Sequence, residues 1–292
     1  MIATVTLNPA IDYTVEIESD PAPDAILRTG AYTYDPGGKG INVAEHLDAM
    51  GIETIATGLV GGELGTMLTT LLDRRGIPLD FVTINGQTRL NTTILSPDGE
   101  RKINQTGPRV SASTVTAVEE RLLEIEPATV VIGGSLPQGV GIEAIERIAA
   151  AGEWETVVDV GGEVLTGLEG TYALCAPNEM ELATATGRRI ETVSDVAVAA
   201  ESLLDAGFRA VVVTRGADGA VLADEAGVVP RSAPVVDVVD TVGAGDAFLA
   251  GFLAAQAAGA ERTAALERGI ATAALSVQTR GTGAPAALAD RD

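Results

Sequence analysis

The sequence predicts an α/β protein built as a three-layer sandwich, in which helices cover both faces of a mainly parallel sheet. Short runs rich in β-branched residues alternate with stretches of helical period, an alternation typical of parallel βαβ units. The length of 292 residues fits one large domain over 1–292. We predict strands at 2–7, 129–134, 156–160 and 210–214, with helices such as 113–126 and 194–206 between them.

Two segments, 12–36 and 86–106, depart from this rhythm because polar and apolar residues alternate in them. The turn at 97–99, Pro-Asp-Gly, predicts a hairpin, since glycine permits the positive φ that tight turns often need. Helical stretches at 41–51 and 63–76 separate the two segments. We therefore expect a small sheet inserted in the main domain, either as a lid over a site or as a solvated edge hairpin.

The chain carries 41 acidic and 19 basic residues, a net charge of −22. Such a charge disfavours nucleic acid as a partner. No apolar run approaches the roughly 20 residues of a membrane span, no signal peptide is indicated, and Cys175 is the sole cysteine. We expect a cytoplasmic protein.

The basic residues comprise 17 arginines and only two lysines, Lys39 and Lys102. We hypothesise a salt-loving host, because molar salt shortens the screening length to about 3 Å and weakens the repulsion among surface acids. An ordinary acidic protein of a dilute cytoplasm is the alternative.

The segment Asp240-Thr-Val-Gly-Ala-Gly-Asp246 precedes an apolar stretch of good helix formers. Glycines at a helix start expose backbone N–H groups and the positive end of the helix dipole, which together suit an anion. Asp246 would lie beside that anion, where a carboxylate can take the proton of an acceptor hydroxyl during phosphoryl transfer. Alternatively, Asp246 only stabilises the first helical turn and the glycines only cap it.

A second glycine-rich segment, Pro36-Gly-Gly-Lys-Gly-Ile-Asn42, leads into the predicted helix at 41–51. It is not a Walker A loop, because Thr33 and Gly40 stand where that pattern needs Gly and Ser or Thr. Its glycines would let a polyhydroxylated substrate lie against the backbone, with Asn42 offering a donor and an acceptor to hydroxyl groups.

Together, GGKG-x-N near position 40 and DTVGAGD near position 240 resemble the paired signatures of the PfkB (ribokinase-like) carbohydrate kinases. The resemblance covers nearly the whole chain and implies a ribokinase-like α/β/α sandwich with a small β-sheet lid, ATP as donor and Mg²⁺ as cofactor. Five segments resemble the 1-phosphofructokinase branch: TLNPAID (6–12), PGGKGIN (36–42), QTRLN (87–91), GSLPQG (134–139) and APNEMEL (176–182).

This resemblance implies roles for individual residues. Asp246 would be the catalytic base, with an anion hole formed by Gly243, Ala244 and Gly245. The substrate would contact Asp12, Gly38, Lys39, Asn42, Arg89, Asn91, Lys102 and Ser135. The nucleotide would lie against Asn178, Thr214, Arg215, Gly216, Ala217, Asp218, Gly219, Thr241 and Gly245. Asn178 and Glu181 match an N-x-x-E element that organises hydrated magnesium.

Arg89 and Lys102 resemble, by position, the residues with which phosphosugar kinases of this family hold the phosphate already present on the substrate. A guanidinium with an ammonium suits a dianion. Solvated lid residues are the alternative. The expected reaction is phosphorylation of fructose 1-phosphate to fructose 1,6-bisphosphate. Fructose 6-phosphate or tagatose 6-phosphate as substrate, and a non-catalytic sugar-phosphate-binding regulator, stay open.

Relatives often carry Lys where this chain has Ala176, which leaves the nucleotide segment with one cation fewer. Relatives also often dimerise through their lids, so the resemblance is compatible with a homodimer of this chain.

Three further residues, His46, Trp154 and Cys175, lack partners that imply chemistry. We expect Trp154 and Cys175 to serve packing, and His46 to serve packing or contact solvent.

Overall fold

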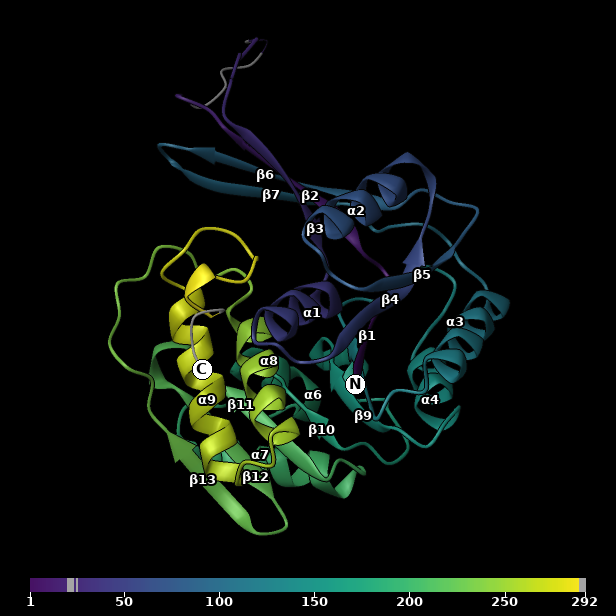
Figure 1. Ribbon diagram of the computed structural model, residues 1–292. Helices are drawn as coiled ribbons and strands as arrows, with labels where there is room; N and C mark the ends of the chain where they lie inside the picture. Colours follow the sequence, from purple (N-terminus) through teal and green to yellow (C-terminus); the bar gives the residue numbers. More distant parts are fainter. Residues whose placement is uncertain (20–23, 25, 289–292) are drawn as a thin grey trace.

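Two β-sheets organise the computed structural model, which describes residues 1–19, 24 and 26–288 (Figure 1). The larger sheet has nine strands in the order β13-β12-β11-β10-β9-β8-β1-β4-β5. The strands from β11 to β5 pair in parallel, and β12 and β13 continue the sheet as antiparallel strands. The bounds are β1 (Ile2–Thr6), β4 (Thr54–Val60), β5 (Leu79–Thr83), β8 (Thr129–Gly133), β9 (Glu155–Asp159), β10 (Leu174–Cys175), β11 (Ala210–Thr214), β12 (Ala220–Asp224) and β13 (Gly227–Arg231).

Helices cover both faces of this sheet, as the alternation predicted (Figure 1). Successive residues of a strand point to opposite faces, so Val130 packs in one apolar cluster and Val131 in the other. The first cluster lies against α3, α4, α6 and α7, and the second against α1, α8 and α9. The bounds are α1 (Lys39–Ala49), α2 (Gly62–Arg74), α3 (Ala112–Ile125), α4 (Glu143–Ala150), α5 (Gly162–Leu165), α6 (Glu179–Thr186), α7 (Val193–Asp205), α8 (Ala244–Ala257) and α9 (Arg262–Ser276).

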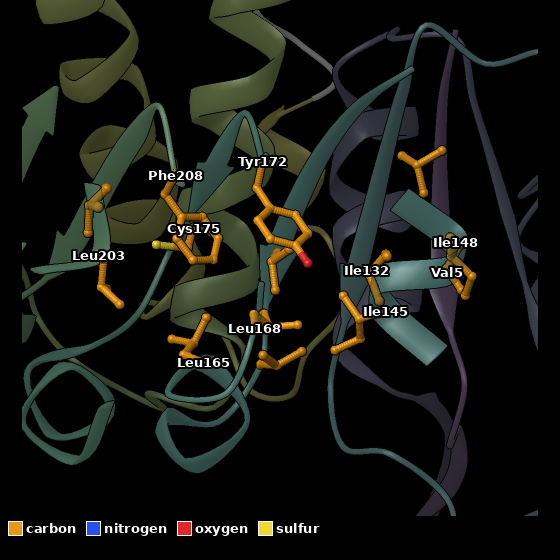
Figure 2. Close-up of a cluster of buried hydrophobic side chains, with 14 of the residues drawn as sticks. Val5, Ile132, Ile145, Ile148, Leu165, Leu168, Tyr172, Cys175, Leu203 and Phe208 are labelled. Atoms are coloured by element: carbon orange, nitrogen blue, oxygen red, sulfur yellow. The ribbon is translucent and has the colours of Figure 1, made fainter. Parts of the chain in front are cut away.

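The core between the sheet and the α4–α7 layer is filled by large side chains (Figure 2). The rings of Tyr172 and Phe208 stack with their centroids 4.9 Å apart, and each fully buried side chain of this size stabilises the fold by about 1.5–3 kcal/mol. Cys175, Trp154 and His46 are all buried, which confirms the packing roles predicted for them.

The smaller sheet has four strands in the order β3-β2-β6-β7. Its strands are β2 (Ala10–Glu16), β3 (Tyr32–Gly37), β6 (Arg89–Ser96) and β7 (Gly99–Asn104). They come from the two segments whose alternation predicted strands, although residues 20–23 and 25 of the first segment lie outside the described part. The hairpin is confirmed, since β6 and β7 pair in antiparallel fashion across a two-residue turn. Figure 1 shows this sheet, which we call the lid, projecting beyond the helical layers above α1.

Across the described residues, no helix combines the length and the apolar character that crossing a membrane requires.

Candidate functional site

The glycine loop predicted at 240–246 lies at the start of α8. Gly243 is the N-cap residue, and its φ of 78° is in the left-handed region that glycine tolerates best. The first N–H groups of a helix have no intrahelical acceptor. Here the Ala244 N–H donates to the Thr241 carbonyl at 3.3 Å, and the N–H groups of Gly243 and Gly245 have no partner within the described residues. A Cβ placed on Gly245 would meet no atom within 4 Å, so the helix start is open on that side. This geometry suits an anion at the positive end of the helix dipole.

Asp246, in the first turn of α8, is only 6% exposed. Its Oδ2 accepts a hydrogen bond of 2.6 Å from Asn42 Nδ2, which joins the two glycine-rich segments. Burial, reinforced by the negative charge of Asp159, raises the pKa of Asp246 from 3.8 to about 7. The Asn42 Oδ1 atom is buried and has no partner within the described residues. The site thus presents a carboxylate able to take a proton near neutral pH and an acceptor ready for a hydroxyl group.

Lys39, predicted to contact the substrate, directs its ammonium toward two carboxylates. Its Nζ lies 2.6 Å from Asp159 Oδ1 and 3.5 Å from Glu181 Oε1. Although burial lowers the pKa of Lys39, the charges of Asp159 and Glu181 outweigh it and raise this pKa above its usual value. Asp159 is buried at the carboxyl end of β9 and was not among the predicted site residues. An acid at the end of the apolar strand predicted at 156–160 was a signal that could have identified it.

Asn178 and Glu181 form the capping box of α6. The Asn178 side chain accepts from the Glu181 N–H, and the Glu181 carboxylate accepts from the Asn178 N–H, both at 2.9 Å. Glu181 is thereby held between the start of α6 and Lys39. Within the described residues, no cluster of three or more His, Cys, Asp or Glu side chains could hold a metal ion directly. The donor set therefore fits an ion held mainly by phosphates and water better than one held by a protein cage.

A cavity of about 550 Å³ adjoins the glycine loop. Its walls beyond the loop are largely apolar and include Val236, Phe248 and Ile270. A volume of this size, with an anion-binding loop at one end, suits a flat ring system carrying phosphates. Of the residues predicted to bind nucleotide, the lining contains Asn178, Thr214, Gly216, Ala217, Gly219, Thr241 and Gly245.

The other two predicted nucleotide residues lie outside this lining. Arg215 Nε donates to Glu179 Oε1 at 2.7 Å, and its guanidinium lies 3.9 Å from Asp218. Both residues lie in the turn between β11 and β12, where Arg215 connects the turn to the start of α6.

The lid presents four of the predicted substrate residues, Asp12, Arg89, Asn91 and Lys102, on one face. Adjacent-strand partners share a face of a sheet, and the register pairs Asp12 with Asn91 and Lys102 with Thr93. Arg89 lies two residues before Asn91 and therefore points to the same side. Asn91 donates to Asp12 Oδ1 at 2.9 Å, and Lys102 lies 3.2 Å from Glu100. One lid face thus gathers a half-buried carboxylate, an amide and two cations.

Burial is the main reason that the pKa of Asp12 is raised, and Asn91, Arg89 and Lys102 counteract it. Asp12 also packs against the glycine-rich segment, because a Cβ on Gly37 would overlap its carboxylate. The neighbouring Gly38 has a φ of 134°, which favours glycine. These glycines let the backbone approach the Asp12 side of the lid closely.

Ser135 and Arg89 are connected through Asn8, a residue that the sequence did not single out. Asn8 Nδ2 donates to Ser135 Oγ at 3.1 Å, and the Asn8 carbonyl accepts from Arg89 Nε at 3.1 Å. Asn8 is 3% exposed, whereas Ser135 is exposed, so the connection runs from the interior to the surface. Its position between β1 and the first lid strand was the available signal.

Similarity to known proteins agrees with this geometry. The model of the pfkB family carbohydrate kinases matches residues 5–288. A 1-phosphofructokinase of Haloferax volcanii is 45% identical over 285 residues, covering 98% of this chain and 93% of that protein. A D-tagatose-1-phosphate kinase of Bacillus licheniformis is 33% identical, covering 97% and 94% of the two chains.

Among solved structures, Escherichia coli phosphofructokinase-2 in complex with fructose-6-phosphate superposes with a TM-score of 0.87 at 29% identity, covering 95% of this chain and 93% of that one. The family match spans almost every described element, from β1 to the end of the helical C-terminal part. This chain is therefore a member of the pfkB family of carbohydrate kinases.

Proposed function

We propose that this protein transfers the γ-phosphoryl group of ATP to the 6-hydroxyl of fructose 1-phosphate, giving fructose 1,6-bisphosphate. One observation carries the proposal: the buried Asp246 lies between the cavity lined by Gly245 and the segment that bears Asn42. A nucleotide in the cavity and a sugar under the lid would meet at this carboxylate. The similarity to a 1-phosphofructokinase over nearly the full chain supports the same substrate.

Asp246 acts as general base. It accepts the proton of the 6-hydroxyl as the oxygen–phosphorus bond forms and the bond to ADP breaks. The N–H groups at the start of α8 stabilise the charge on the transferred phosphoryl group. Asn42 Nδ2 holds Asp246 in place through its hydrogen bond. The Oδ1 atom of Asn42, which has no partner within the described residues, can accept a hydrogen bond from a sugar hydroxyl. Mg²⁺, when bound, would neutralise phosphate charge, with Asn178 and Glu181 accepting from its hydration shell.

Arg89 and Lys102 are proposed to bind the phosphate that the sugar already carries, because they are cations on the substrate face of the lid. The alternatives are fructose 6-phosphate or tagatose 6-phosphate, which present that phosphate at the other end of the sugar. The similarity to a D-tagatose-1-phosphate kinase adds tagatose 1-phosphate as a competitor. The presence of both the base Asp246 and the glycine loop for an anion argues against a non-catalytic regulator.

The test is an initial-rate comparison of these four sugar phosphates with Mg-ATP in molar KCl. We expect the highest kcat/KM for fructose 1-phosphate. Arg89→Gln should raise its KM at least tenfold, since a charge-assisted contact contributes about 1.5–3 kcal/mol. Arg121→Gln, which removes a cation from the outer surface of α3, is the matched control. A preference for another sugar overturns the substrate, and no turnover with any of the four favours the regulator.

We further propose that the protein dimerises through the lid. The register places Tyr13, Tyr34 and Ile103 on the lid face opposite Asp12. Tyr13 and Tyr34 stack at 4.7 Å, and Ile103 is 59% exposed. An apolar lid face of this kind is best buried by the same face of a second copy. Sedimentation equilibrium of Ile103→Asp should give a monomer, whereas Val198→Asp on the exposed side of α7 should not change the mass.

Two proposals remain: a salt-loving host, which the acidic composition supports, and a cytoplasmic location, which the low cysteine content supports. Activity and secondary structure should both decline when molar KCl is removed, because self-repulsion then acts over a longer range. If both persist unchanged without salt, the first of these proposals fails.

A further inference from the structure

Asn8 occupies the short connection between β1 and β2, where the main sheet leads into the lid. It is almost fully buried, and its amide nitrogen donates two hydrogen bonds of 3.1 Å, to the carbonyl of Thr106 and to Ser135 Oγ. A main-chain carbonyl can only accept, so the atom facing Thr106 must be the NH₂ group. The orientation of the amide is therefore fixed by the backbone.

This orientation determines what the hydroxyl of Ser135 can do. Its oxygen accepts from Asn8, so its proton is directed elsewhere. In the described part of the chain no acceptor takes that proton, and the Ser135 side chain is exposed. Ser135 is therefore set up as a donor toward a ligand oxygen.

The same amide fixes the surroundings of Arg89. Two main-chain carbonyls hold this guanidinium: Nε donates to Asn8 and Nη1 to Gln105, both at 3.1 Å. Gln105 directly precedes Thr106, which Asn8 binds through its side chain. The bond from the Asn8 side chain to Thr106 thus holds the neighbouring Gln105 carbonyl at a fixed position relative to the Asn8 carbonyl. These two carbonyls together orient Arg89.

We propose that Asn8 is a positioning residue of the sugar-phosphate site, which makes Ser135 a hydrogen-bond donor and aligns Arg89 toward the phosphate of the substrate. The inference rests on the proposed function, in which Arg89 binds that phosphate. Asn8 itself need not touch the substrate, because it acts through the two groups that it holds.

The test measures KM for fructose 1-phosphate and for ATP separately. Asn8→Ala removes both donated bonds, and we expect KM for the sugar phosphate to rise about tenfold while KM for ATP stays within twofold. Asn8→Asp keeps the shape but turns both donors into acceptors, so that the carboxylate captures the Ser135 proton and the rise is larger. Asn85→Ala and Asn85→Asp, on an exposed loop, are the matched controls.

A double-mutant cycle separates positioning from a general structural role. Ser135→Ala removes an exposed hydroxyl and is expected to fold normally and to raise the same KM about tenfold. In that background Asn8→Ala should cost clearly less than in the parent, because one of its two effects is already lost. Independent, multiplying effects, equal rises in both KM values, or an unchanged KM in Ser135→Ala would each overturn the proposal. A parent enzyme that is inactive on every sugar phosphate would instead refute the proposed function, and with it this role.

Discussion

Replacing Asp246 by Asn should stabilise the fold while it removes catalysis. Burial raises the pKa of this carboxyl from 3.8 to about 7, so at alkaline pH the folded state has to carry a charge that it disfavours. Because the folded pKa lies above the unfolded one, the parent loses stability as the pH rises from about 4 to about 7. Asparagine is neutral at every pH and can still accept the hydrogen bond from Asn42.

The size of the effect follows from the two pKa values. A difference of one pH unit corresponds to about 1.36 kcal/mol. At pH 8 the ionised carboxylate therefore lowers the free energy of unfolding of the parent by about 4 kcal/mol. At pH 5.5, where the carboxyl is protonated in the fold and ionised in the unfolded chain, the cost is about 2 kcal/mol. Asp246→Asn should gain about these amounts, and its kcat should fall by about 10²–10⁴-fold.

Urea denaturation in molar KCl at pH 5.5 and pH 8 measures both free energies. Asp205→Asn, which removes an exposed carboxylate at the end of α7, controls for the loss of one negative charge from an acidic protein. The reasoning is refuted if Asp246→Asn is less stable than the parent at pH 8, or if its advantage is the same at the two pH values. Retention of near-parental turnover would remove the base assignment.

Other predictions concern the same site and the core. The kcat/KM for fructose 1-phosphate should fall as the pH drops below about 7, since Asp246 must be ionised to accept a proton; a flat profile from pH 6 to pH 8 contradicts this. Lys39→Met removes the positive charge that offsets Asp159 and Glu181, so the pKa of Asp246 should rise and the fall in kcat/KM should begin at a higher pH. Lys39→Arg keeps that charge and should return the pH profile most of the way to that of the parent. Ile145→Ala empties a fully buried position in α4 and should cost about 2–5 kcal/mol in urea denaturation, whereas Leu123→Ala at a half-exposed position should cost under 1 kcal/mol.

The parts of the fold that were predicted are those that local sequence encodes. The β-branched runs became β1, β8, β9 and β11, and the alternating segments became the lid. The glycine loop was predicted because its backbone geometry and its chemistry lie within seven consecutive residues. The two-residue strand β10 is too short to show any periodicity, and its pairing depends on its neighbours in the sheet.

The connections within the site were not predictable in the same way. Lys39 and Asp159 are 120 residues apart, and Asn8 and Ser135 are 127 apart. Asn8 and Ser135 meet because β1 and β8 are adjacent parallel strands, whose carboxyl ends share one edge of the sheet. Lys39 meets Asp159 because α1 begins over the carboxyl end of β8, which is the neighbour of β9. Which ends become neighbours depends on the strand order, and a hydrophobic pattern along the chain does not contain that order.

The lid has a consequence for how the chain reaches its folded state. The lid is built from two separate segments of the chain, β2 with β3 and β6 with β7. Strand β2 pairs with β6, and the bonded residues Asp12 and Asn91 are 79 positions apart in the sequence. The hairpin of β6 and β7 can form locally, but its pairing with β2 closes a loop that contains α1, β4, α2 and β5. Closing such a loop has an entropic cost that is recovered only once the intervening elements are packed. We therefore expect the binding face to assemble late in folding, so that a partly folded chain would have much of its core but no site.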